Sequence, residues 1–597
     1  MRCRGLVKVP STSNKYKIFL RLLIAADRVQ FARLLIEIKV ARSISIPEAP
    51  VAVEGSEATV PALSAAPSCQ LNTLPPLRGR HVNSRLSHNM ARAPAVFYVL
   101  LCLLITERVL SNKARNVLIL LADDGGFELG AYGNKICQTP NIDALARRGL
   151  LFNNAFNSVS SCSTSRAALL TGTPSHQSGM YGLHHGVHHF NAFDNLTSLP
   201  NLLRQNGVYT GIIGKKHVGP DDVFRFDYEQ TERNNHIDQV GRNITHIKLL
   251  ARDFLANANR DNKSFFLYVG FHDPHRCGHS EPQYGAFCER FGSGEPGMGT
   301  IPDWAPWYYQ WDEVQLPYHV QDTEAARRDI AAQYTTMSRL DQGVGLILKE
   351  LEAAGHKEDT LVIYTSDNGI PFPGGRTNLH EAGVRAPLLV ASPEPGARRN
   401  QASYAMASQL DLMPTVLDWF GISTERAEDN EVTHGDEPKS LLPILIKEPA
   451  YSEAEAVFAS QTHHEVTMYY PMRAVRTRRY KLLHNLHHAM PFPIDQDLYV
   501  SPTFQDILNR TRSKRPLPWY KTLRQYYYRP QWELYDLRRD PAELNNLHGK
   551  PSLTEVEAEL RARLQSWQRR TRDPWRCAPA GVLDHDQCFA LDNGLAD

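Results

Sequence analysis

The sequence lacks an excess of charge of either sign. Its 66 lysines and arginines are nearly balanced by 64 aspartates and glutamates, so no overall field favours nucleic acid as a partner. The chain also has no internal repeat and no long low-complexity tract, which excludes a repetitive scaffold. Its 597 residues allow a large core and more than one domain, as in a globular enzyme or binding protein.

Long hydrophobic runs are scarce, and the run near the N-terminus is too short to cross a membrane. Residues 95–105 are apolar and follow the basic start at Met90, which is typical of a secretory signal peptide rather than a membrane anchor. We therefore expect a signal peptide at 90–111 and an unstructured or non-native extension at 1–89. One alternative is that the basic run 15–40 belongs to a mitochondrial presequence.

Cysteine is sparse, with nine residues in the chain. Cys277 and Cys288 lie close in sequence, as do Cys577 and Cys588, so each pair can form a small disulfide loop in an oxidising compartment. Four glycosylation sequons also favour the secretory pathway. They begin at Asn195, Asn243, Asn262 and Asn509.

Apolar stretches separated by helical patterns predict an α/β domain. The stretches 116–121 and 361–365 read as strands buried on both faces, and each runs into a polar turn. Strands that alternate with helices predict a large, mostly parallel sheet flanked by helices, with functional groups at the carboxyl ends of the strands. Further strands are expected at 208–213, 265–269 and 387–390, and helices at 141–148, 166–170, 199–205, 247–256 and 325–354.

The pattern changes after about residue 460. Residues 473–486 alternate as strands do, 532–536 predicts another strand, and 553–570 predicts a closing helix. We therefore expect a smaller antiparallel α+β domain at 466–597, after a catalytic domain at 112–465.

Two acidic turns predict a metal site. Asp123 and Asp124 follow the first strand, and Asp367 and Asn368 follow the strand at 361–365. One parallel sheet would bring all four to one edge, where clustered carboxylates need a counter-ion. Taken singly, each is an ordinary turn. Together, their oxygen ligands favour Ca²⁺ or Mg²⁺.

A reactive group is expected at the start of a helix. Cys162 and Arg166 stand four residues apart before the apolar run 167–170, and a helix N-terminus offers free amides and positive potential to an anion. After another strand, Lys215 could neutralise an anion and His217 could assist a nucleophile.

These motifs together resemble the sulfatase family. Residues 162–166 resemble its Cys-x-Pro-Ser-Arg signature, 214–217 its Gly-Lys-x-His element, and 271–275 its histidine after a proline. The resemblance implies the alkaline-phosphatase-like fold, Ca²⁺ at the acidic turns, and oxidation of Cys162 to formylglycine by the formylglycine-generating enzyme. It also implies that His275 is the leaving-group acid, with His272 as its neighbour, and that Arg376 contacts sulfate or substrate.

Within the family, the resemblance is closest to the lysosomal heparan N-sulfatases. It rests on 121–128, 214–220 and 271–279, and on 463–468 and 490–497, which lie outside the common sulfatase core. It implies that a homodimer removes N-linked sulfate from terminal N-sulfoglucosamine of heparan sulfate in the lysosome.

Other functions stay open at this point. Thr164 stands where the family usually has proline, which the formylglycine-generating enzyme reads, so a non-catalytic heparan-sulfate-binding protein is one alternative. A sulfatase acting on O-linked sulfate is another. A phosphohydrolase of the same superfamily would normally carry serine or threonine in place of Cys162. The histidines at 184, 185, 188 and 189 invite a zinc site, but a polar loop near the cleft is favoured.

Overall fold

The computed structural model describes residues 115–277, 287–423, 437–453 and 455–591. The extension expected at 1–89 and the signal peptide expected at 90–111 lie outside the described residues. In the part of the chain that is described, no helix combines the length and apolar character needed to span a membrane.

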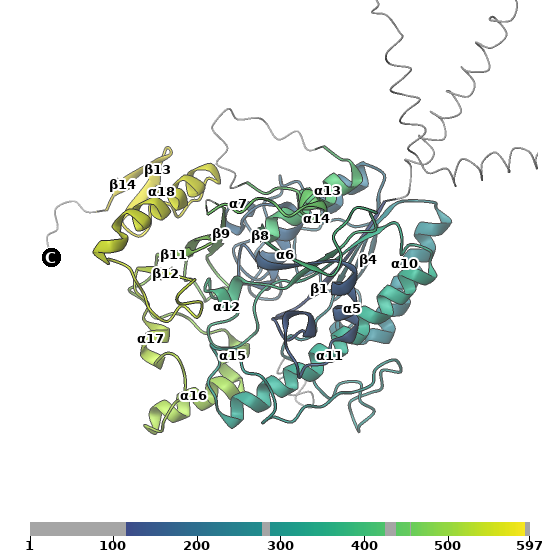
Figure 1. Cartoon of the computed structure of the whole chain (residues 1–597), viewed down its shortest axis with the longest axis horizontal. Helices are drawn as coiled ribbons and strands as arrows, with labels where there is room; N and C mark the ends of the chain where they lie inside the picture. Colours follow the sequence, from purple (N-terminus) through teal and green to yellow (C-terminus); the bar gives the residue numbers. More distant parts are fainter. Residues whose placement is uncertain (1–114, 278–286, 424–436, 454, 592–597) are drawn as a thin grey trace, which may run out of the picture. The chain divides into compact units, whose positions relative to one another are not determined.

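An eight-stranded sheet organises the larger part of the molecule (Figure 1). Of its eight strands, only β7 runs opposite to its neighbours, so the predicted mostly parallel sheet is confirmed. In spatial order the strands are β4 (Tyr228–Thr231), β3 (Tyr209–Gly214), β5 (Phe265–Gly270), β1 (Asn116–Ala122), β6 (Thr360–Ser366), β7 (Leu388–Ala391), β2 (Leu150–Phe156) and β8 (Gln401–Ser408).

Helices cover both faces of this sheet because its central strands are apolar on both sides. Val117 and Ile119 of β1 belong to one core, while Leu118 and Leu120 face a second. The first core is covered by α6 (Cys162–Thr171), α8 (Leu199–Gln205) and α13 (Leu412–Phe420), and the second by α5 (Pro140–Arg148), α10 (Ile244–Arg260) and α11 (Glu324–Ala353) (Figure 1).

A second, four-stranded antiparallel sheet follows in sequence. Helix α18 (Thr554–Arg570) packs on one face through Leu560, Leu564 and Trp567. The other face shares a core with Phe156 and Met406 of the large sheet. Its strands, in spatial order, are β12 (Trp532–Asp536), β11 (Tyr480–Asn485), β10 (Met472–Thr477) and β9 (Ala456–Gln461).

Both predicted disulfides are confirmed. Cys577 bonds to Cys588 at the two-stranded hairpin of β13 (Gly581–Asp584) and β14 (Gln587–Ala590), and Cys277 bonds to Cys288 beside the large sheet. A third structural tie is the fully buried ion pair of Arg473 and Asp573, which anchors β10 to the segment after α18.

His176 makes the stability of this fold sensitive to acid. The ring is 2% exposed, and its two nitrogens hydrogen-bond to Ser460 and Thr571. Burial lowers its pKa to about 3, whereas an unfolded histidine titrates near 6.5. Between these values the unfolded chain binds a proton that the folded chain does not, so stability falls as pH falls. His176 should therefore lower the free energy of unfolding by about 2 kcal/mol at pH 5 relative to pH 7.

We therefore expect His176→Gln to lose less stability on acidification than the wild type does. Thermal unfolding measured across this pH range checks the prediction. The matched control is His585→Gln, because the side chain of His585 is 93% exposed. An unchanged pH slope in His176→Gln would contradict the assignment.

Candidate active site

Four adjacent parallel strands deliver the predicted site residues to one edge of the large sheet. Residues after β3, β5, β1 and β6 meet there, and Ala122 pairs with Ser366 at the ends of β1 and β6. The structure therefore brings the two acidic turns together. Lys215 follows β3, His272 and His275 follow β5, Asp123 and Asp124 follow β1, and Asp367 and Asn368 follow β6.

The acidic turns fit a hard divalent cation. All four side chains are buried at 0% exposure. Among the described residues, no donor makes a hydrogen bond to the buried oxygens Asp123 Oδ1 and Asn368 Oδ1, as expected of oxygens directed at a ligand. Ligand atoms of Asp123, Asp367 and Cys162 lie within 4.8 Å of one another. Oxygen donors of this kind suit Ca²⁺ or Mg²⁺.

Burial and mutual repulsion raise the pKa values of two carboxylates in this cluster. Burial raises the pKa of Asp124 to about 8, with Arg376 opposing the shift and the neighbouring aspartates adding to it. Burial and the charge of Asp123 raise the pKa of Asp367 to about 6. A divalent cation would relieve this repulsion and hold both groups ionised.

Two cations share the cluster with the acids. Arg166 is fully buried and donates from Nε and Nη2 to Asp367 Oδ2, at 3.0 and 2.8 Å. Its Nη2 is also 3.2 Å from Asp123 Oδ1. Lys215 Nζ lies 2.6 Å from Asp123 Oδ2. Each cation therefore contacts at least one of the metal-type ligands directly.

Cys162 is the first residue of α6, so the N-terminus of this helix lies at the acidic cluster. The side chain is 1% exposed, and burial raises the pKa of its thiol well above the usual value, an effect that the charge of Lys215 opposes. An unmodified thiol here is therefore protonated and a poor nucleophile. Thr164 fits the first turn, because its Oγ1 donates to the carbonyl oxygen of Ser161 at 2.7 Å.

His217 is held beside the cavity by backbone and ring contacts. Its amide donates to Glu232 Oε1 at 2.8 Å, and its Nε2 contacts His185 Nδ1. His217 has φ +54°, and Asp124 has φ +61°. Non-glycine residues in this left-handed region store strain, and such residues gather at functional sites.

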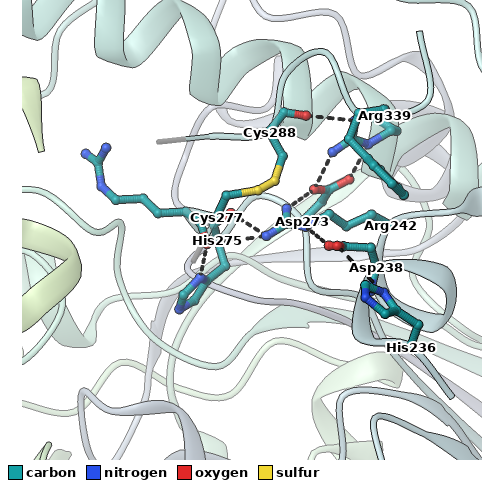
Figure 2. The surroundings of a disulfide bond; sticks show 10 residues. His236, Asp238, Arg242, Asp273, His275, Cys277, Cys288 and Arg339 are labelled. Atoms are coloured by element: carbon teal, nitrogen blue, oxygen red, sulfur yellow. Dashed lines mark hydrogen bonds and ion pairs between the residues drawn. A yellow bond between two sulfur atoms is a disulfide. The ribbon is translucent and has the colours of Figure 1, made fainter. Parts of the chain in front are cut away.

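A buried ionic cluster fixes the backbone of His275 (Figure 2). Arg242 donates to the carbonyl oxygen of His275 at 3.0 Å and also pairs with Asp273. Asp273 in turn accepts two hydrogen bonds from Arg339. The disulfide of Cys277 closes the same loop two residues later.

The ring of His275 presents Nε2 to the cavity. Nδ1 lies 2.6 Å from the carbonyl oxygen of Arg276, so Nδ1 carries the proton of the neutral ring. Nε2 lies 2.9 Å from Arg376 Nη1. Burial lowers the pKa of His275 well below its usual value; the charge of Asp123 opposes this shift, and Lys215 and Arg376 add to it.

Arg376 is held by carboxylates from the edge of the large sheet and from the C-terminal part of the chain. Nη1 donates to Asp124 Oδ2 at 2.7 Å, and Nη2 donates to Asp495 Oδ1 at 2.8 Å. Nη2 is also 3.1 Å from Asp497 Oδ2. The sequence indicated Arg376 but not its acidic partners.

A cavity of about 500 Å³ is lined by six of the predicted site residues: Cys162, Lys215, His217, His272, His275 and Arg376. The two segments that lie outside the common sulfatase core both contribute to its wall, His464 and Glu465 from 463–468 and Gln496 and Asp497 from 490–497. Sequence reasoning had marked these segments but assigned no role to their side chains. His464 Nδ1 also lies 2.8 Å from Ser161 Oγ, next to Cys162.

The histidine-rich run forms part of the rim. His185 and His188 line the cavity, and His188 Nδ1 accepts the amide of Val466. Among the described residues, no cluster of three metal-type ligands includes a histidine of this run. The place of His185 and His188 on the cavity wall is that expected of a polar loop near the cleft.

The predicted glycan acceptors lie at the surface of the described residues. Asn195, Asn262 and Asn509 are exposed. Asn243 is half-buried and caps α10 by accepting the amide of His246. Their glycosylation stays a prediction.

Comparisons with known proteins agree with this geometry. A family model described as Sulfatase matches residues 115–422, and one described as N-sulphoglucosamine sulphohydrolase, C-terminal, matches residues 506–570. Human N-sulphoglucosamine sulphohydrolase is 60% identical over 487 residues, covering 81% of this chain and 96% of the human protein. Human arylsulfatase A is 27% identical over 499 residues, covering 73% and 83%.

A solved structure shows the same fold. A protein in complex with its substrate D-glucosamine-2-N,6-O-disulfate aligns with a TM-score of 0.54 at 20% identity, covering 77% of this chain and 99% of that one. The predicted alkaline-phosphatase-like sulfatase fold is confirmed. Because the first family model spans more than half of the sequence and the human relative is 60% identical across most of it, the chain belongs to the sulfatase family.

Proposed function

We propose that this protein hydrolyses the N-linked sulfate of terminal N-sulfoglucosamine residues in heparan sulfate. The observation that carries the proposal is that both segments particular to the N-sulfatase resemblance line the cavity that holds Cys162. The 60% identity to a protein named for this substrate supports it further.

The proposed roles follow from the contacts. Formylglycine made from Cys162 supplies the nucleophile toward sulfur. Asp123, Asp124, Asp367 and Asn368 would hold Ca²⁺, which when bound would supply positive charge to the sulfuryl oxygens. Arg166 and Lys215 hold the acidic ligands in place and add positive charge where the anion is bound. Buried ion pairs join Arg166 to Asp123 and Asp367, and Lys215 to Asp123, so these side chains are already fixed in place before substrate binds.

Proton transfer is assigned to two histidines. His275 is the leaving-group acid, and a second proton on its ring would reside on Nε2, the nitrogen that faces the cavity. The negative charge of a bound sulfamate favours that protonation, against the burial that disfavours it. His217 is the base for release of sulfate, and its contact with His185 orients its ring.

Removal of the metal should abolish activity without unfolding the protein. We expect a strong chelator to reduce hydrolysis at least about 100-fold, because the acidic cluster loses its charge balance and the sulfuryl oxygens lose a Lewis acid. Sulfate release measured before and after dialysis against Ca²⁺, Mg²⁺ or Zn²⁺ identifies the ion. Restoration by Zn²⁺ alone would contradict the oxygen-ligand assignment.

The substrate is tested by sulfate release from N-sulfoglucosamine and from glucosamine 6-sulfate. Preference for the first supports the proposal, and preference for the second would favour a sulfatase acting on O-linked sulfate. Tight binding of N-sulfoglucosamine with no turnover of either would favour a non-catalytic heparan-sulfate-binding protein. Delivery to the lysosome, a homodimer and maturation by the formylglycine-generating enzyme stay predictions of the family resemblance.

A further inference from the structure

The wall of the cavity formed by residues of the C-terminal part carries an excess of negative charge. Asp495 and Asp497 flank the start of α15 (Gln496–Val500), and both pair with Arg376 Nη2. The other amino group of Arg376 pairs with Asp124. Two carboxylates of the C-terminal part therefore share one amino group of Arg376, so this wall can accept a further cation.

Asp495 and Asp497 are not equivalent. Asp495 is buried, and its Oδ1 also accepts the amide of Leu498 as the cap of α15, so its contacts are structural. The Asp497 side chain is 27% exposed and lines the cavity. Within the described part of the chain, no hydrogen bond involves Asp497 Oδ1, which leaves this oxygen free for a ligand.

Asp497 stands next to the group assigned to the leaving nitrogen. Its Oδ2 lies 3.6 Å from His275 Nε2. A nitrogen that receives a proton from Nε2 therefore comes within reach of the Asp497 carboxylate. The disposition places an acid and an anion side by side where the substrate's amine departs.

The chemistry of this step distinguishes nitrogen from oxygen. As the S–N bond breaks, the nitrogen keeps the electron pair and takes a proton, and in acid the amine becomes an ammonium. Overall, one sulfamate and one water give one ammonium and one sulfate dianion. Breakage of an S–O bond gives a neutral hydroxyl instead. A carboxylate binds an ammonium through a charge-assisted hydrogen bond but gains much less from a hydroxyl.

We propose that Asp497 is a specificity-determining residue that binds the C2 nitrogen of the sugar as its charge develops, and so favours N-linked over O-linked sulfate. The proposal rests on the proposed function, which places the C2 nitrogen beside His275. It gives the segment 490–497 a chemical role: Asp497 pairs with Nη2 of Arg376, whereas Asp124 at the edge of the large sheet pairs with Nη1 and is assigned to the metal.

The test compares glucosamine with glucose, which carries a hydroxyl in place of the C2 ammonium. Binding is measured by calorimetry at acid pH and by inhibition of N-sulfoglucosamine hydrolysis. We expect the wild type to bind glucosamine more tightly than glucose. Asp497→Asn should weaken glucosamine binding about tenfold and leave glucose binding unchanged. Asp497→Glu keeps the charge and should keep most of the preference.

The matched control is Asp506→Asn, an aspartate of α16 (Pro502–Arg512) that pairs with Arg510. This control should bind both sugars as the wild type does. Equal weakening of glucosamine and glucose in Asp497→Asn would overturn the proposal, because it would indicate only a displaced Arg376. An unchanged preference would overturn it as well. If N-sulfoglucosamine is not hydrolysed but calorimetry still shows the Asp497-dependent preference, the proposed function fails while the amine site stands.

Discussion

Cys162→Ala is expected to abolish sulfate release, with a loss of at least about 10⁴-fold, because alanine lacks the thiol that must be oxidised to give formylglycine. The residue lies at the first position of α6 and is 1% exposed. Alanine is compatible with that helical position and is smaller than cysteine, so the fold should persist. Initial rates on N-sulfoglucosamine, together with a melting curve, measure the two effects separately.

The matched control for this variant is Cys137→Ala. Cys137 is the other free cysteine among the described residues, and it is also buried. It packs in the core that includes α5 and α11, and it does not line the cavity. This variant should retain activity within about twofold, since only stability is affected by a small void. Residual activity above about one per cent in Cys162→Ala would argue for another nucleophile.

Asp367→Asn is expected to reduce activity by at least about 10³-fold. Asp367 is fully buried, accepts both Arg166 donors through Oδ2, and accepts the amide of Asp124 through Oδ1. Asparagine keeps the shape but removes the charge that Arg166 and a metal ion share. We therefore expect both weaker Ca²⁺ binding and a fall in stability of about 1–3 kcal/mol from the poorly paired Arg166. Calcium titration and thermal unfolding separate the two contributions.

Asp359→Asn provides the control on the same strand. Asp359 precedes β6 whereas Asp367 follows it, so the two acids lie at opposite ends of one strand. Asp359 pairs with His356 and lies away from the cavity. Normal activity in Asp367→Asn, or equal losses in the two variants, would contradict the assignment of Asp367 to the metal site.

Much of the fold can be predicted because its central strands are continuously apolar. The strands β1, β3, β5 and β6 read as such in the sequence, and the polar residues after them mark the functional edge. The strands β2 and β8 escaped prediction because they contain asparagine, serine and several alanines, which break the apolar pattern. These residues form strands because they pack within the sheet, and their intrinsic strand propensity alone does not predict it.

The metal-type acids and Lys215 could be predicted because strand ends in a parallel sheet share one edge. Cys162 and Arg166, which start a helix, were predicted from the sulfatase signature and the apolar run that follows it. The acids on the opposite wall were not. Asp495 and Asp497 follow the large sheet by more than eighty residues in sequence, and only tertiary packing brings them to Arg376. Glu232 and Arg242 were also missed, because their role is to hold backbone, at His217 and His275 respectively. No sequence spacing indicates such a contact.

The central claim is that Cys162 becomes formylglycine in spite of Thr164, and the mass of the peptide that contains residue 162 tests it most directly. The chain is expressed in cells that possess the formylglycine-generating enzyme, with Thr164→Pro as the reference, since the first turn of α6 accommodates proline. We predict the aldehyde at residue 162 in both proteins. Unmodified cysteine in the natural sequence, with aldehyde in Thr164→Pro, would contradict the catalytic account and leave a heparan-sulfate-binding protein.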